Sequence, residues 1–145
     1  MNRLKKEAEQ LAKEDLEWAS AEPTDDLFNW NVSLAGPEGT PYDGGLFNLS
    51  FKFSADYPFK APDVRFLTPV YHPSIKKDSG EICADLIKSD WKPAMNIRSI
   101  LVILQDMLKE PTAESPLEPE IAELLTNNPE EFAKKASEAT KKYAC

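Results

Sequence analysis

The stretch that decides the fold is Phe47-Asn48-Leu49-Ser50-Phe51-Lys52-Phe53, in which apolar residues alternate strictly with polar ones. A period of two is typical of a strand that buries one face and exposes the other, and it predicts a strand over residues 45–54. The same alternation over residues 28–34 predicts a second strand. Because turn formers separate the two at Gly36-Pro37-Glu38-Gly39, we expect the strands to be antiparallel.

Downstream of this pair, the alternation stops at Tyr57-Pro58-Phe59-Lys60-Ala61-Pro62, which holds too many prolines for a central strand. Val64 and Phe66 then predict a short third strand. Residues 68–96 show no clear periodicity, yet they are too apolar for a disordered segment. Long irregular stretches of this kind are usually functional in compact domains, so we expect an ordered functional loop.

Helical periodicity flanks the strands on both sides. It predicts an amphipathic helix over residues 3–16 and a second helix over 97–109, with Asn96 as its N-cap. Glu118-Pro119 predicts the start of a short helix, and Asn128-Pro129 predicts the start of a last one that runs to about Tyr143. The residues that this last helix should turn inward are Phe132, Ala136, Ala139 and Tyr143.

The segment between the first helix and the first strand, Ala21–Asp26, is rich in turn formers and is expected to be a loop. The order of elements is then a helix, strands, a long loop and further helices. This order predicts an α+β fold with a segregated antiparallel sheet, in one domain that spans residues 1–145.

Composition excludes several classes of protein. Acidic residues outnumber basic ones by 25 to 17, and a net charge of −8 argues against a nucleic-acid binder, whose affinity rests on Lys and Arg. No apolar run approaches the length of about 20 residues that spans a bilayer, and the charged N-terminus is unlike a signal peptide. We therefore expect no membrane span, and a lone internal cysteine in a chain without an export signal indicates a reducing compartment. His72 and two distant cysteines form no zinc-ligand set, so we expect neither a metal nor a cofactor.

Cys83, in the segment Gly80-Glu81-Ile82-Cys83, is the one candidate nucleophile with a suggestive setting. Taken alone, an internal cysteine is most often a small buried hydrophobe. However, Cys83 lies in the same long loop as Tyr71-His72-Pro73-Ser74, so a Cys–His pair is an alternative. No orienting third residue is identifiable from the spacing, which favours a His72 that holds a turn.

Seven short motifs occur along the chain in this order: Gly36-Pro37, Pro41-Tyr42-Asp43-Gly44-Gly45, Tyr57-Pro58-Phe59-Lys60-Ala61-Pro62, Tyr71-His72-Pro73-Ser74-Ile75, Gly80-Glu81-Ile82-Cys83, Trp91-Lys92-Pro93-Ala94 and Pro116-Leu117. Each is weak alone, but together they resemble the ubiquitin-conjugating enzyme family over residues 3–143. The resemblance implies an N-terminal helix, a four-stranded antiparallel meander, an active-site loop, a central helix and two C-terminal helices. It places a fourth strand, which the periodicity does not show, near Val70-Tyr71.

The resemblance also implies a chemistry. Cys83 would accept ubiquitin, or a ubiquitin-like protein, as a thioester from an activating enzyme in an ATP-dependent pathway. It would then pass the acyl group to a substrate lysine or to a ligase cysteine. Asp85 matches a family position that orients the attacking lysine and takes up its proton, and Ser115 matches the gate position, which in the family is Asp or Ser.

Ser74 is the one clear departure, because the family's His-Pro-Asn is His-Pro-Ser in this chain. The family's Asn stabilises the oxyanion of the intermediate or orders the loop. Loss of one oxyanion donor costs about 10²–10³ in rate, although a Ser hydroxyl still donates one hydrogen bond. We expect charging at Cys83 to survive, while the efficiency of transfer to lysine stays open.

Partner surfaces follow from the same resemblance. Pro58, Phe59 and Lys92-Pro93-Ala94 match the surface that docks RING and HECT ligases, and Arg3, Lys5 and Lys6 match the helix face that meets the activating enzyme or a ligase. Without the family, a Phe between prolines is more often a core residue. Residues 110–131 hold seven Glu and no Lys or Arg, which indicates a solvated acidic face or a partner surface. We expect a monomer in the cytoplasm, the nucleus or both.

Two other functions compete with a transferase. A non-catalytic variant of the same fold would act as a binding partner; such variants usually lack the cysteine, so Cys83 argues against one and Ser74 keeps it open. A thiol redox protein would need a resolving cysteine near Cys83, and the only other cysteine is Cys145.

Overall fold

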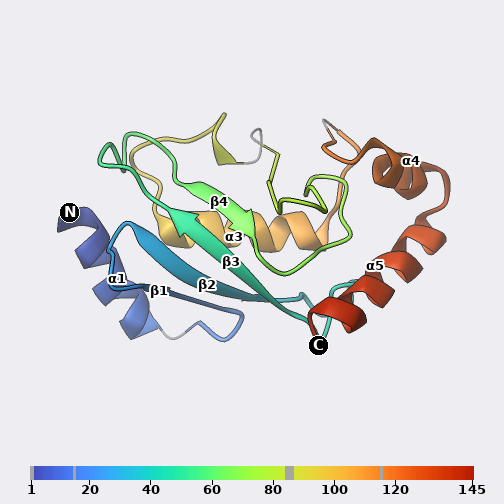
Figure 1. Cartoon of the computed structure of the whole chain (residues 1–145), viewed down its shortest axis with the longest axis horizontal. Helices are drawn as coiled ribbons and strands as arrows, with labels where there is room; N and C mark the ends of the chain where they lie inside the picture. The colour runs from blue at the N-terminus through green and yellow to red at the C-terminus, as the bar shows by residue number, and fades with distance from the viewer. Residues whose placement is uncertain (1, 15, 84–86, 115) are drawn as a thin grey trace.

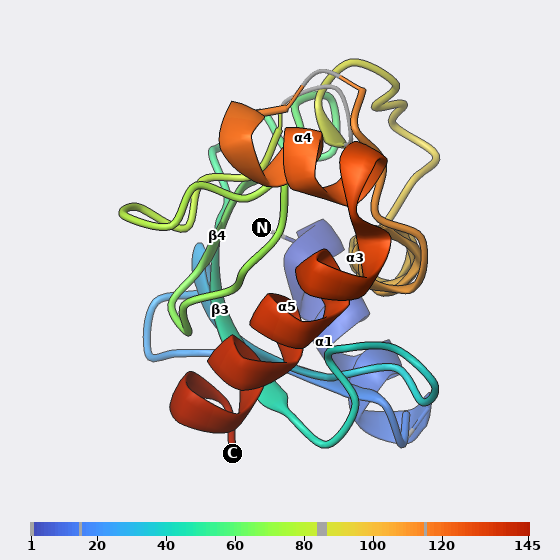
Figure 2. The same ribbon diagram turned by 90° about the vertical axis from the view of Figure 1, so that its right-hand side faces the viewer.

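The computed structural model describes residues 2–14, 16–83, 87–114 and 116–145. Within these ranges the chain forms, in order, α1 (Asn2–Glu14), β1 (Ala19–Pro23), β2 (Asn29–Ala35), β3 (Leu46–Lys52), β4 (Asp63–Phe66), α3 (Ile97–Lys109), α4 (Pro119–Asn127) and α5 (Pro129–Tyr143). The strands pair antiparallel in the order β1-β2-β3-β4, which confirms the α+β fold with a meander sheet. In Figure 1, α3 runs behind the sheet, α1 lies beside β1, and α4 and α5 lie at the opposite end. Figure 2 looks onto this α4–α5 end.

The alternating residues of β2 and β3 form the centre of the core, as expected. The two strands place Trp30 opposite Phe51, and Val32 opposite Leu49, and all four are at most 2% exposed. The helix α3 adds its apolar stripe to the same core, with residues Ile97, Ile100, Leu101, Leu104 and Leu108 fully buried. Burial of this apolar surface is the main force that holds α3 against the sheet.

The prediction of a loop at Ala21–Asp26 is wrong over its first half, because β1 covers Ala19–Pro23. Its pairing with β2 begins with Ala19 opposite Leu34 and ends with Pro23 opposite Trp30. It lies at the edge of the sheet, where a proline at the strand end is tolerated because its missing N–H need not enter the ladder. A periodicity search misses it, because its short side chains and proline carry no apolar alternation.

The fourth strand predicted near Val70-Tyr71 is also wrong, because the fourth strand is β1 and these two residues belong to no strand. They are held instead by side-chain contacts. Val70 is 3% exposed in the core, and the carbonyl of Tyr71 accepts a hydrogen bond of 2.7 Å from the hydroxyl of Tyr42.

The helix starts agree with their capping signals. Asn96 caps α3, since its Oδ1 accepts the Ser99 N–H at 2.9 Å and the Ser99 hydroxyl accepts the Asn96 N–H in return. The prediction that Tyr143 faces inward is wrong, because it is 49% exposed while Thr140 occupies the buried position. Among the described residues, no helix combines the length and apolar character needed to cross a membrane.

Candidate active site

Cys83 is held in place by a tight turn and by pairing with the His72-Pro73-Ser74 segment. The turn ends at Gly80, whose φ of +73° and close approach to the Phe66 carbonyl leave no room for a side chain. Ile75 and Ile82 then form an antiparallel bridge, and the Cys83 N–H donates to the Ser74 carbonyl at 3.0 Å. The structure therefore brings Cys83 and Ser74, which lie in the same long loop, directly opposite each other.

His72 is fully buried, and both of its ring nitrogens contact backbone groups. The Ser74 N–H donates to Nδ1 at 2.9 Å, so Nε2 carries the hydrogen and donates to the Met107 carbonyl at 2.8 Å. Burial lowers the pKa of His72 to about 4, which keeps the ring neutral. This geometry favours the turn-holding role of His72 over that of a general base, because neither nitrogen is available to a thiol.

One more segment, just before α4, holds the same turn. The Pro73 carbonyl accepts hydrogen bonds from the Leu117 N–H at 2.9 Å and the Glu118 N–H at 3.0 Å. The Glu118 carboxylate in turn accepts the Lys77 N–H at 3.0 Å. The chain just before α4 is thereby docked on the turn. Of the predicted site residues, Ser115 and Asp85 lie outside the described residues, and their roles stay predictions.

Cys83 is 8% exposed and lines a small hollow, the Cys83 hollow, of about 70 Å³. Residues 62–65, 81–83 and 87–88 form its walls. Ser74 is 4% exposed, and its backbone is engaged on both sides, by His72 and by Cys83. The main chain of Ser74 is thus part of the bonding that orders the loop.

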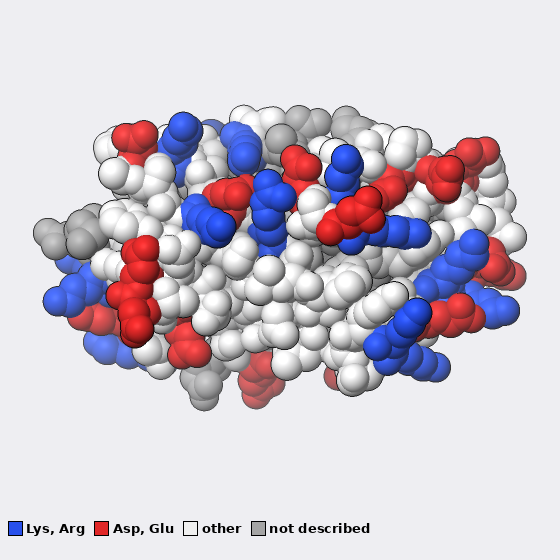
Figure 3. All heavy atoms as spheres, in the orientation of Figure 1, with Lys and Arg blue, Asp and Glu red and all other residues white. Residues whose placement is uncertain are grey.

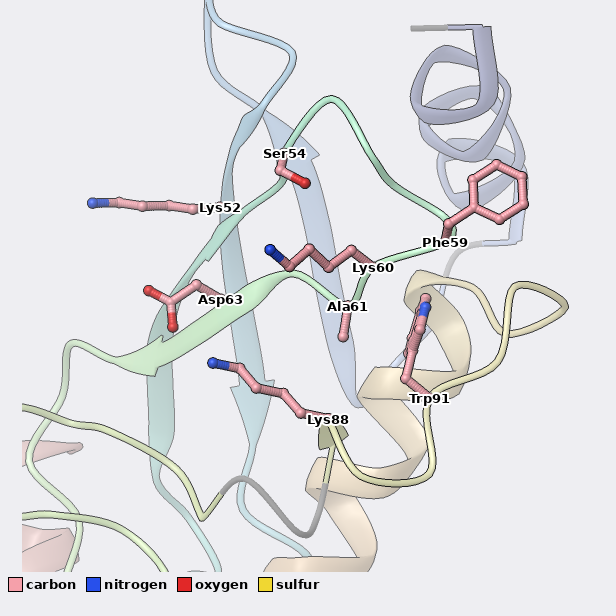
Figure 4. A pocket seen from close by; sticks show the side chains of 8 residues that line it. All are labelled: Lys52, Ser54, Phe59, Lys60, Ala61, Asp63, Lys88 and Trp91. Atoms are coloured by element: carbon pink, nitrogen blue, oxygen red, sulfur yellow. The ribbon is translucent and has the colours of Figure 1, made fainter.

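A second region carries the predicted partner residues. We call it the docking surface and define it by Arg3, Pro58, Phe59, Trp91 and residues 92–94. Phe59 is 78% exposed, which excludes the core alternative for this residue. Figure 4 shows its ring at the outer edge of a hollow of about 420 Å³, with Trp91 in the neighbouring segment. The Trp91 indole N–H donates to the Pro58 carbonyl at 2.7 Å and ties the two loops together.

Arg3 and Glu7 connect this surface to α1. The Arg3 guanidinium donates to the Met95 carbonyl at 2.9 Å and pairs with Glu7 at 2.9 Å. Glu7 also accepts the Tyr57 hydroxyl at 2.6 Å and the Ile97 N–H at 2.7 Å. Burial and then the Glu7 hydrogen bond raise the pKa of Tyr57. Sequence reasoning missed Glu7, although its spacing of four residues from Arg3 on one helix was the available signal.

The remaining predicted partner residues are solvent-exposed: Lys5, Lys6, Lys92, Pro93 and Ala94. The segment 110–131 exposes five of its seven glutamates: Glu110, Glu114, Glu120, Glu123 and Glu130. Figure 3 shows acidic side chains gathered at the α4 end of the molecule, with lysines over α5 below them. Among the described residues no cluster of His, Cys, Asp and Glu could hold a metal ion.

Comparisons with known proteins agree with this geometry. The family model described as "Ubiquitin-conjugating enzyme" matches residues 3–140. An Arabidopsis thaliana protein named "Probable ubiquitin-conjugating enzyme E2 31" is 41% identical over 134 residues, which cover 92% of this chain and 86% of that protein. The E2 domain of a Toxoplasma gondii ubiquitin conjugating enzyme superposes with a TM-score of 0.91 at 35% identity, covering 99% of this chain and 98% of the other. A second solved structure, from Plasmodium yoelii, gives a TM-score of 0.93 at 38% identity and covers 99% and 94%.

Proposed function

The chain belongs to the ubiquitin-conjugating enzyme family, and on that premise we propose that it carries ubiquitin as a thioester on Cys83 and passes it to an acceptor. The observation that carries the proposal is the placement of Cys83 in a hollow, fixed opposite the His72-Pro73-Ser74 turn by a backbone hydrogen bond of 3.0 Å. A cysteine that served only as core filler would need no such turn, and the hollow gives an acyl group a place to lie.

The first step is an exchange between thioesters. The Cys83 sulfur attacks the carbonyl carbon that joins ubiquitin to the activating enzyme, a new C–S bond forms, and the enzyme's cysteine leaves as a thiolate. The proton of the Cys83 thiol passes to solvent. A thioester is already an activated acyl group, so this step needs no strong general base. A step without a general base fits this site, because the ring nitrogens of His72 contact only backbone groups.

The second step is attack by an acceptor amine or thiol on the Cys83 thioester. With an amine, a C–N bond forms, the C–S bond breaks and the Cys83 thiolate leaves. The tetrahedral intermediate carries an oxyanion, and Ser74 stands where the family has its amide donor. Asp85 is proposed to orient the amine and to take up its proton, and Ser115 is proposed to occupy the gate position beside the amine.

The docking surface is proposed to engage RING and HECT ligases through Phe59, and Arg3 and Lys6 are proposed to meet a ligase or the activating enzyme. Exposed aromatic residues are the usual anchors of small interfaces. The Phe59 side chain is 78% exposed in a loop that Trp91 holds in place, and the free energy cost of exposing an apolar ring to water is recovered when a partner covers it. We further propose that the chain acts as a monomer in the cytoplasm or nucleus.

A charging reaction tests the proposal. The purified chain is incubated with activating enzyme, ATP and ubiquitin, and the products are separated with and without thiol reductant. We expect an adduct that the reductant removes. Ser74 favours a second candidate, a non-catalytic variant that binds partners through the docking surface. That candidate predicts no adduct, together with retained binding to a RING domain.

A further inference from the structure

We propose that Glu118 is a positioning residue for the transfer step, because it holds the turn that presents Ser74 to the thioester. This inference rests on the proposed function, since it concerns discharge of that thioester. We call residues 72–77 the Ser74 turn. The motivating observation is that Glu118 bonds this turn on both sides of Ser74. Its N–H donates to the Pro73 carbonyl at 3.0 Å, and its carboxylate accepts the Lys77 N–H at 3.0 Å.

The half-buried Glu118 side chain serves the Ser74 turn rather than its own helix. Glu118 is the N-cap residue of α4, a position from which a side chain commonly accepts an N–H of the first helical turn. Here the side chain makes no capping hydrogen bond. The Glu118 carbonyl accepts the N–H groups of Ile121 and Ala122 at 3.1 Å, and these backbone bonds start α4. The carboxylate can therefore be removed without taking a cap from α4.

Two side chains join the Ser74 turn to the helices, one at each end. At the inner end, the buried His72 ring donates to the Met107 carbonyl near the end of α3. At the outer end, Lys77 is solvent-exposed, and its N–H donates to Glu118 at the start of α4. Figure 1 shows the turn beside the orange segment that leads into α4. Glu118 thus links the exposed end of the turn to the helical part of the fold.

The position of the Ser74 turn matters for acyl transfer because Ser74 lies between the two bonds that Glu118 makes. The Ser74 carbonyl accepts the Cys83 N–H at 3.0 Å, so movement of the turn also moves the backbone that carries the thioester. A hydroxyl must lie about 3 Å from the oxyanion to donate to it, and a misplacement of about 1 Å costs up to about 10² in rate. Discharge to free lysine should be the most sensitive step, because no partner protein then orders the turn.

A positioning role requires a hydrogen-bond acceptor at residue 118 rather than a charge. Gln has the same length as Glu and keeps a carbonyl oxygen that can accept the Lys77 N–H, whereas Ala has no acceptor. A Glu118 that instead took up the proton of the attacking amine would lose that ability in Gln and Ala alike. The two substitutions therefore separate positioning from proton transfer.

The experiment combines amide hydrogen exchange in the uncharged protein with single-turnover discharge of the preformed thioester to free lysine. It compares the parent with Glu118→Ala, Glu118→Gln and Glu123→Ala, the matched control that removes an exposed carboxylate from α4. Exchange at the Lys77 amide, followed by NMR, should speed about fivefold in Glu118→Ala, the effect of one lost hydrogen bond, and stay unchanged in Glu118→Gln. Discharge should slow about tenfold in Glu118→Ala, by the same factor from about pH 7 to 9, and change less than about twofold in the other two variants.

The outcomes separate this inference from the proposed function. If the parent forms no reductant-sensitive adduct, the proposed function fails and the inference fails with it. If the thioester forms, the inference alone is overturned when Glu118→Ala discharges like the parent, when Glu118→Gln or Glu123→Ala is equally slow, or when exchange at Lys77 is unchanged. Faster exchange throughout α4 in Glu118→Ala would show that the side chain serves the helix, and this result would also overturn the inference.

Discussion

At the Cys83 site the bonds that fix the geometry join backbone groups, whereas at the docking surface they run through side chains. The Ser74 carbonyl holds Cys83, and the Pro73 carbonyl holds the chain before α4. At the docking surface, Arg3, Glu7 and Trp91 make the corresponding bonds with their side chains. The difference teaches that the geometry of the Cys83 site rests mainly on backbone groups, whereas the geometry of the docking surface rests on side chains.

The side chains of His72 and Glu118 are exceptions at the Cys83 site, and that of His72 bonds the backbone through both ring nitrogens. We expect His72→Ala to lower the free energy of unfolding by about 3 kcal/mol, since it leaves a cavity and unpairs the Ser74 N–H and the Met107 carbonyl. Denaturant unfolding measures this loss, and Lys76→Ala, at an exposed position of the same loop, is the control. A loss similar to that of the control would show that His72 does not hold the turn.

The pH dependence of stability sharpens the same point. With a pKa of about 4 in the folded chain and an ordinary value of 6.5 when unfolded, His72 binds its proton more readily in the unfolded state. Stability should thus be fully present above pH 6.5 and fall by about 2 kcal/mol between pH 6.5 and 5. Unfolding curves measured across this range give the free energy of unfolding at each pH. Its dependence on pH should be weaker in His72→Gln. An equal slope in both proteins would contradict the assignment.

At the docking surface, the Phe59 side chain should matter for ligase binding and not for the stability of the fold. We expect Phe59→Ala to leave charging and the melting temperature unchanged and to slow ligase-stimulated discharge about thirtyfold, the effect of an interface anchor worth about 2 kcal/mol. Tyr143→Ala, which truncates an exposed aromatic ring on α5, is the matched control. If Phe59→Ala has a lower melting temperature than the unmodified protein, or discharges with a ligase at the unmodified rate, the docking surface is assigned wrongly.

Ser74 gives the smallest expected change and probes whether its side chain matters at all. If the missing amide donor limits transfer, Ser74→Asn should speed discharge to free lysine about tenfold, the low end of an oxyanion-donor effect. Charging should change little. Single-turnover discharge of the preformed thioester measures this rate. Equal rates for both proteins would show that the position acts only by ordering the loop through its backbone.

Periodicity predicts the parts of this fold that have strong local signals. The apolar stripe and cap of α3 place it at Ile97–Lys109, as predicted, and the alternation of β2 and β3 places them within a residue or two. In contrast, β1 is specified by its pairing with β2 rather than by its own residues, so only the three-dimensional structure reveals it.

The candidate site also has a part that the sequence predicts and a part that only the structure reveals. Motif spacing singles out Cys83, Ser74 and His72, and the structure brings them together. The partners that hold them, Met107 and Leu117, lie 35 and 44 residues away from the residues they bond and contribute backbone atoms. A backbone carbonyl or N–H leaves no mark on residue type, so no sequence pattern could have indicated these contacts. Glu7 differs, because it bonds through its carboxylate: its spacing from Arg3 was a local signal, whereas its partners Tyr57 and Ile97 lie 50 and 90 residues away.

The central claim is that Cys83 carries the acyl group, and replacing its sulfur by oxygen tests this most directly. Cys83→Ser should convert the reductant-sensitive adduct into a stable oxyester, whereas Cys145→Ser, at the exposed last residue, should charge like the unmodified protein. Both variants and the parent are charged side by side and separated with and without thiol reductant. A reductant-sensitive adduct that persists in Cys83→Ser, or that disappears in Cys145→Ser alone, would contradict the account.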